Sequence, residues 1–319
     1  MADAVLIVAA GDPSSAPAGP LARGIVAADP AVMVEAVEPP GAKLPAAGPV
    51  AAASRAVAAR SRARHIPALV TLNGARVVVS DEPATILALG RLRGSGMLAV
   101  PAVALVTREA DPASQSAPGI DLHLLADPAM RATVRETAPD SRIVCVRGLL
   151  DPRYEADFEV AASRRAIGVP EGCPLVVIWG GQDARGDLLG AGEVSLGADP
   201  ASRVVILCGS NSERLAELQE AFGRSRRLRA VGPTDRLPDL LAAADVLVET
   251  AGGLTSLEAR LRGAAVVAHG SSRLADRQAL ANALIAALRE PRTAIGGYAD
   301  RPAAADEVLA AAGFLPAPA

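Results

Sequence analysis

Short apolar segments alternate along the chain with longer segments in which apolar residues recur at helical spacing. This alternation is typical of βαβ units, which build parallel sheets covered by helices. The first half predicts strands at Ala4–Ala10, Val32–Val37, Arg76–Ser80, Val100–Val106, Leu122–Leu125 and Arg142–Val146. It predicts helices at Leu21–Ala28, Val50–Arg64 and Pro83–Arg91.

The pattern restarts near Leu149–Glu155, where a predicted helix, Ala156–Ile167, leads into a second series of strands. These strands are Leu175–Trp179, Arg203–Leu207, Leu228–Val231, Val246–Val248 and Ala265–Ala268. Helices are expected at Ser212–Phe222, Leu237–Ala243, Leu254–Arg262, Asp276–Arg289 and Ala303–Ala312.

The restart predicts an α/β protein of two Rossmann-like domains that face each other across a cleft. The first covers residues 1–149 and the second residues 150–300, and a C-terminal helix within 301–319 packs back toward the first domain. One long doubly wound sheet is the alternative. In either case, ligands are expected outside the carboxyl ends of the strands.

Composition narrows the classes of function. The 319 residues are 50% hydrophobic and only 2% aromatic, so a sizeable core is expected but aromatic platforms for single-stranded nucleic acid are not. A net charge of −3 argues against nucleic acid as a partner. The three cysteines lie far apart, with no spacing that suggests a metal site, and no cofactor is predicted. Without a signal-peptide pattern or a membrane-spanning run, the chain reads as cytoplasmic, with peripheral contact at the inner face of the membrane left open.

Two glycines, Gly252 and Gly253, separate a predicted strand from a predicted helix. Backbone amides can approach an anion closely there, and the helix N-terminus favours negative charge. Thr255 can cap this helix or bind phosphate, and the carboxylate of Glu258 can accept hydroxyl protons from a ribose. A plain βα turn with a helix-start glutamate is the competing interpretation.

This second half resembles the C-terminal domain of GT-B glycosyltransferases, the group that includes monogalactosyldiacylglycerol synthases and the N-acetylglucosaminyltransferase of peptidoglycan synthesis. The resemblance rests on the GGLTSLE segment and on DRQALANA, which begins at Asp276. It implies that the glycines, Leu254, Thr255 and Glu258 contact the diphosphate and ribose of a UDP-sugar. It also implies that Thr234 lies at the uracil, and that Gln278 and Asn282 bind hydroxyls of the donor sugar.

Further donor-binding candidates lie where other strands of this half end. The pairs Gly180–Gly181 and Gly209–Ser210 follow two predicted strands, and the first pair resembles the family's Gly loop, with Gln182 where a small hydroxyl residue is usual. His269 ends the AVVAH strand, which is a cleft position in this fold. His123 lies inside a strand and is expected to be a hydrogen-bonded core or edge residue, whereas His65 is expected at a solvent-facing helix end.

The first half departs from the family. Where these enzymes carry a glycine-rich loop with a histidine, this chain has AAGDPSS, and Asp12 stands at the histidine's place. Asp12 is therefore the candidate general base, unless it is only a turn residue before Pro13. Glu109, with Asp111 in reserve, is the second candidate for acceptor contact.

The resemblance implies an inverting, metal-independent glycosyltransferase that moves a sugar from UDP to a hydroxyl or amine of a lipid or small-molecule acceptor. The residues alone do not separate UDP from dTDP or GDP. Two other functions stay open: a binding partner that keeps the nucleotide site without activity, and a UDP-sugar hydrolase or epimerase on the same fold.

Overall fold

The computed structural model describes residues 4–9, 17–38, 49–109, 111–250, 253–269 and 273–316. The chain forms two compact units, Met1–Pro152 with Gly297–Ala319 and Arg153–Gly296. Each unit is built on its own parallel sheet, so the prediction of two parallel-sheet domains is confirmed and the single-sheet alternative is wrong. No helix among the described residues is apolar over a stretch long enough to cross a bilayer.

The first unit contains a six-stranded parallel sheet in the order β2-β1-β3-β4-β5-β6. Its strands are β1 (Ala4–Val8), β2 (Met33–Val37), β3 (Ala75–Ser80), β4 (Ala102–Val106), β5 (Leu122–Leu125) and β6 (Arg142–Cys145). Its helices are α1 (Ala18–Ala28), α2 (Pro49–Asn73), α3 (Pro83–Gly94), α4 (Arg131–Thr137) and α12 (Ala304–Ala311), and α5 (Pro152–Glu155) spans the boundary between the units.

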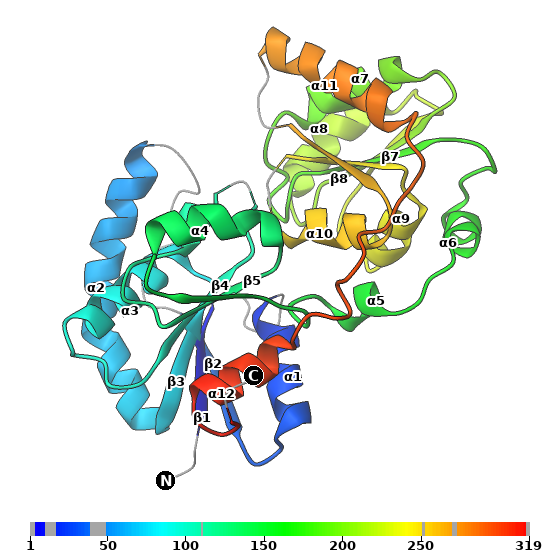
Figure 1. Cartoon of the computed structure of the whole chain (residues 1–319). Helices are drawn as coiled ribbons and strands as arrows, with labels where there is room; N and C mark the ends of the chain where they lie inside the picture. Colours follow the sequence, from blue (N-terminus) through cyan, green and yellow to red (C-terminus); the bar gives the residue numbers. More distant parts are fainter. Residues whose placement is uncertain are drawn as a thin grey trace. The chain divides into compact units, whose positions relative to one another are not determined.

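Helices cover both faces of this sheet (Figure 1). On one face, α2 and α3 pack together over a core that contains Leu6, Val78 and Leu89. On the other, α12 packs against α1, and the buried Glu307 of α12 forms an ion pair with Arg142 of β6. The last helix of the chain thus belongs to the first unit.

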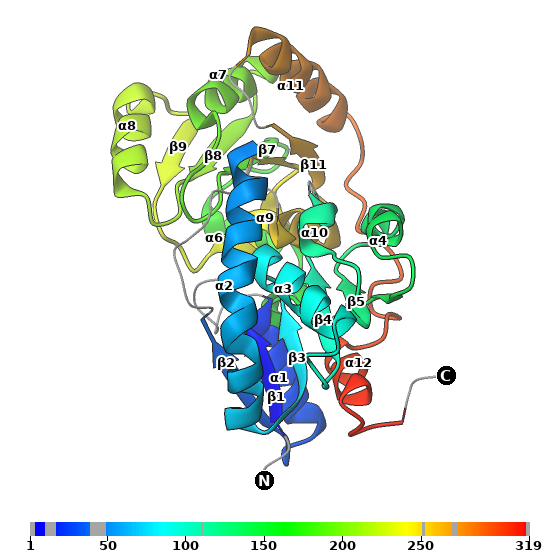
Figure 2. The ribbon, with the colours of Figure 1, turned by 90° about the vertical axis from the view of Figure 1, so that its left-hand side faces the viewer.

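Helix α2 is longer than the sequence predicted. It continues past Arg64 and through Pro67 to Asn73, as the long ribbon in Figure 2 shows. The proline removes one helical hydrogen bond, but Ile66 is buried in the core and Leu69 packs against it, so tertiary packing outweighs the local break. His65 is exposed as expected, yet it lies within the helix and not at its end.

His123 on β5 is fully buried, and neither ring nitrogen has a hydrogen-bond partner in the part of the chain that the structure describes. The expectation of a hydrogen-bonded histidine is therefore wrong. Burial, with the charge of Arg135 adding to it, lowers the pKa of His123 to about 4, because both penalise the protonated ring.

The second unit contains a five-stranded parallel sheet in the order β11-β10-β7-β8-β9. Its strands are β7 (Leu175–Trp179), β8 (Arg203–Leu207), β9 (Leu228–Val231), β10 (Val246–Glu249) and β11 (Ala265–Ala268). Its helices are α6 (Val160–Ile167), α7 (Leu188–Ala198), α8 (Ser212–Phe222), α9 (Leu237–Ala243), α10 (Leu254–Leu261) and α11 (Leu274–Ala287). Helices α7, α8 and α11 cover one face, and α6, α9 and α10 cover the other (Figure 1).

Two helices of this unit differ from the sequence prediction. Helix α6 begins at Val160 and not at Ala156, because Glu159 is extended and the carbonyl of Ala156 accepts a hydrogen bond from Arg262. Helix α7 was not predicted, since its sequence contains three glycines, which disfavour helices. One of them, Gly192, lies so close to Ile206 and Phe222 that a Cβ atom would be about 3.0 Å from each.

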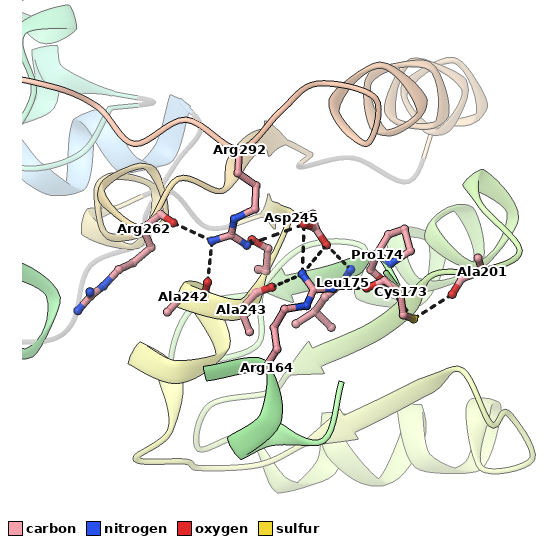
Figure 3. Close-up of polar contacts among 11 residues, drawn as sticks. Arg164, Cys173, Pro174, Leu175, Ala201, Ala242, Ala243, Asp245, Arg262 and Arg292 are labelled. Atoms are coloured by element: carbon pink, nitrogen blue, oxygen red, sulfur yellow. Dashed lines mark hydrogen bonds and ion pairs between the residues drawn. The ribbon is translucent and has the colours of Figure 1, made fainter. Parts of the chain in front are cut away.

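A polar network joins the amino ends of β7 and β10 (Figure 3). Asp245, directly before β10, accepts a 2.7 Å hydrogen bond from the backbone N–H of Leu175 and forms an ion pair with Arg164. Arg292 donates to the carbonyls of Ala244, Ala242 and Arg262. Burial lowers the pKa of Arg292, and the Asp245 carboxylate opposes that shift.

We expect Arg292→Met to destabilise the protein by ~2–4 kcal/mol, because it strips hydrogen bonds from three carbonyls. The free energy of unfolding from denaturant titration measures this loss. Arg289→Met, at an exposed position nearby, is the control and is expected to change it by less than ~0.5 kcal/mol. Equal stability of the two variants would contradict the role given to the network.

Candidate functional site

The strand order of the second sheet reverses at β7. From β7 the chain proceeds to β8 and β9 on one side, and then crosses to β10 and β11 on the other. Loops that follow strands on either side of such a point diverge and leave a crevice at the carboxyl edge, where α/β sheets bind ligands. The described residues that border this point are residues 180–187 after β7, and Thr250 and Gly253 after β10.

The loop after β7 folds back on itself. The amide of Arg185 donates a 2.6 Å bond to the carbonyl of Gly180, and Gly181 adopts a positive φ of 72°. The hydroxyl of Thr250, just past β10, donates to the carbonyl of Arg185 at 2.6 Å. A Cβ atom on Gly186 would lie 2.7 Å from the Thr250 Cβ, so glycine permits this close approach between the two segments.

The second glycine loop is attached to the first. Both the amide and the hydroxyl of Ser210 donate to the carbonyl of Gln182, at 2.8 and 3.1 Å. Gly209 has a φ of 51°, and a Cβ there would lie 2.3 Å from the same carbonyl oxygen. The structure thus brings four predicted site residues together, Gly180, Gly181, Gly209 and Ser210, although the serine hydroxyl is already engaged.

Helix α10 begins at the same edge of the sheet, after β10. Gly253 is its N-cap residue, with a φ of 137° that favours glycine, and it has no side chain that could cap the first turn. Leu254 and Thr255 are half-buried at this end, and Gly252 lies outside the described residues. Glu258 is on the second turn and only 7% exposed. The uncapped amides and the helix dipole make this end suited to an anion.

Three of the other predicted donor residues take part in local polar contacts. The hydroxyl of Thr234, in the loop after β9, accepts a 3.1 Å bond from the amide of Arg236. Gln278 and Asn282 are both exposed on α11, and the Gln278 amide donates to Asn282 at 3.2 Å. Neither contact excludes a ligand, since each side chain keeps further hydrogen-bonding capacity.

His269 follows β11 and is buried, and its Nε2 atom has no hydrogen-bond partner among the described residues. This atom lies 3.9 Å from Oδ2 of Asp187, the N-cap residue of α7. Asp187 also binds Arg277 of α11, with 2.9 Å between Nε and Oδ2. Sequence reasoning named His269 but missed Asp187 and Arg277, although Arg277 lies inside the DRQ segment that it singled out.

The candidates of the first unit are less fully placed. Asp12 lies outside the described residues. Glu109 is half-buried after β4. Nearby, the amide of Thr107 donates a hydrogen bond to the side chain of the buried Gln115. Asp111 instead has a structural task, because its carboxylate accepts from the Ser114 amide and caps a short 3-10 helix.

Among the described residues, no group of three histidine, cysteine, aspartate or glutamate side chains is arranged to hold an ion.

No protein-family model matches the sequence, and no curated protein matches it in a sequence search. Solved structures do resemble it. A sucrose-phosphate synthase from Thermosynechococcus elongatus is 16% identical and aligns over 91% of this chain and 90% of its own, with a TM-score of 0.61. WaaG, a glycosyltransferase involved in lipopolysaccharide biosynthesis, is 13% identical over 90% of each chain, with a TM-score of 0.52.

The fold is GT-B. A UDP-GlcNAc 2-epimerase from Neisseria meningitidis, determined with UDP-GlcNAc bound, also shares it, at 9% identity over 98% of each chain and a TM-score of 0.59. Because transferases and an epimerase share this fold, the fold alone does not determine the reaction.

Proposed function

We propose that this protein is a UDP-sugar-dependent, inverting glycosyltransferase whose donor binds at the carboxyl edge of the second sheet. The observation that carries the proposal is the uncapped N-terminus of α10 at the point where the strand order reverses. Anionic ligands favour such helix ends. The resemblance of GGLTSLE and DRQALANA to the donor segments of monogalactosyldiacylglycerol synthases and the peptidoglycan N-acetylglucosaminyltransferase makes a UDP-sugar the preferred ligand.

In this proposal, the amides from Gly253 to Thr255 bind the diphosphate, and Glu258 accepts hydrogen bonds from the ribose. The loop that holds Thr234 contacts the uracil. When the bond between the sugar and the diphosphate breaks, negative charge accumulates on the leaving UDP. Amides that already point at those oxygens stabilise the charge without reorganisation, and this is where the site would accelerate the reaction.

The acceptor is a hydroxyl or amine that attacks the anomeric carbon from the opposite face. Asp12, or Glu109 in its place, takes the proton of the nucleophile, while the bond to the diphosphate breaks and UDP leaves. We assign acceptor binding to the first unit and donor binding to the second. Whether the acceptor is a lipid at the inner face of the membrane or a small molecule depends on loops of the first unit.

An epimerase is the second candidate, because the Neisseria UDP-GlcNAc 2-epimerase shares the fold over nearly its whole length. The two reactions leave different products. A transferase releases UDP only when an acceptor is present, a hydrolase releases it without one, and an epimerase converts UDP-GlcNAc into a second UDP-sugar. Chromatography of UDP-GlcNAc, UDP-glucose and UDP-galactose incubations, with and without acceptors, separates the three outcomes.

The donor site predicts the effect of Glu258→Ala. Loss of charge-assisted hydrogen bonds to the ribose should weaken UDP binding by ~1.5–3 kcal/mol, as measured by calorimetry. Glu220→Ala, an exposed carboxylate of α8 in the same unit, should leave the affinity unchanged. If Glu258→Ala binds UDP as tightly as the parent, the ribose contact is wrong.

The base assignment predicts that Asp12→Asn loses turnover by ~10²–10⁴-fold while UDP affinity stays within about twofold, because donor binding is assigned to the other unit. The readout is acceptor-dependent UDP release. Undiminished turnover would make Asp12 a turn residue and move the base to Glu109, which Glu109→Gln then tests. A parent that binds UDP but transfers to no acceptor would favour the non-catalytic binding partner.

A further inference from the structure

One charged cluster at the carboxyl edge of the second sheet is built more elaborately than a helix cap requires. The Asp187 carboxylate accepts from the Gly190 amide at 3.0 Å, and Arg277 donates to both of its oxygens, at 2.9 and 3.2 Å. Arg277 also reaches Glu193 at 3.2 Å. A Cβ atom on Gly190 would lie 2.2 Å from Asp187 Oδ2, so this glycine is what lets the arginine and the aspartate meet.

The remaining member of the cluster is His269. Its side chain is 2% exposed, and its Nε2 atom lies 3.9 Å from Asp187 Oδ2, which is too far for a hydrogen bond. Since a buried polar atom without a partner carries a free-energy cost, the position calls for a polar group that bonds to it. An oxygen about 2.8 Å from both atoms would meet them at an angle of about 90°, which a hydroxyl accommodates.

The cluster adjoins the proposed donor site. The amide of His269 donates to the carbonyl of Glu249, the last residue of β10. Gly186, the neighbour of Asp187, touches Thr250 beyond that strand. Asp187 and His269 therefore lie near the carboxyl ends of β10 and β11, and Thr250 precedes by only a few positions Gly253, where α10 begins.

Charge decides which part of a donor fits here. The cluster sets one guanidinium, Arg277, against two carboxylates, Asp187 and Glu193. A diphosphate would meet surplus negative charge, which disfavours it. A neutral hydroxyl that donates to Asp187 and bonds to His269 meets no such penalty. The uncapped end of α10 is the better place for the phosphates.

We propose that Asp187 and His269 form a subsite for one hydroxyl of the donor sugar, with Arg277 as the residue that positions Asp187. The inference rests on the proposed function and deepens it, since it assigns sugar recognition to residues outside the DRQALANA resemblance, apart from Arg277. A subsite of this kind distinguishes epimeric sugars, because a misdirected hydroxyl leaves the Nε2 atom of His269 without a partner.

The test compares UDP with UDP-sugars. Calorimetry of the parent with UDP, UDP-glucose, UDP-galactose and UDP-GlcNAc identifies the sugar that binds more tightly than UDP alone. In His269→Phe we expect the affinity for that UDP-sugar to fall about tenfold, while UDP affinity changes less than about twofold. Asp187→Asn, which keeps an oxygen for the Gly190 amide, should give the same pattern, and His65→Phe, an exposed histidine of the first unit, should change neither affinity.

The outcomes are separable. If UDP and the UDP-sugar weaken equally in both variants, or if neither weakens, the sugar subsite is wrong while the donor site stands. A thermal unfolding scan identifies a variant that fails to fold, and the other variant then decides. If the parent binds UDP but no UDP-sugar more tightly, the subsite is also wrong. A parent that binds no UDP overturns the proposed function itself.

Discussion

The carboxylate of Asp245 fixes the two strands on which the candidate site depends. Asp245 directly precedes β10. Its carboxylate accepts a 2.7 Å hydrogen bond from the backbone N–H of Leu175, the first residue of β7. These strands pair in parallel, with Val246 opposite Val176. A slip of one residue would turn every side chain of β10 to the other face of the sheet. By holding the amino ends in register, Asp245 determines where Thr250 and Gly253 emerge at the opposite edge.

The segments at which the second unit begins and ends are also held at the amino edge of the sheet. Arg262, at the end of α10, donates to the carbonyls of Arg153 and Ala156 and stacks over Phe158, with its guanidinium carbon 4.2 Å from the ring centre. Arg292 donates in turn to the carbonyl of Arg262 (Figure 3). Helix α10 therefore has the proposed diphosphate site at its amino end. At its other end, hydrogen bonds hold the segments by which the chain enters and leaves the second unit.

The sequence was most informative where local pattern and tertiary burial agree. Strands β7 and β8 were predicted with their observed bounds because buried parallel strands are continuous apolar runs. Helix α7 was missed because its glycines are explained by neighbours distant in the chain. Asp187 and Arg277 are 90 positions apart, so nothing local marks them as a pair, whereas Gly253 and Glu258 fall within one segment and could be recognised together.

In the proposed function, a nucleotide diphosphate binds where the order of the second sheet reverses. A crystal structure of the protein saturated with UDP tests it most directly. We expect diphosphate oxygens on the amides from Gly253 to Thr255 and ribose hydroxyls within hydrogen-bond distance of Glu258. UDP found in the first unit, or at the amino edge beside Arg164 and Asp245, would contradict it.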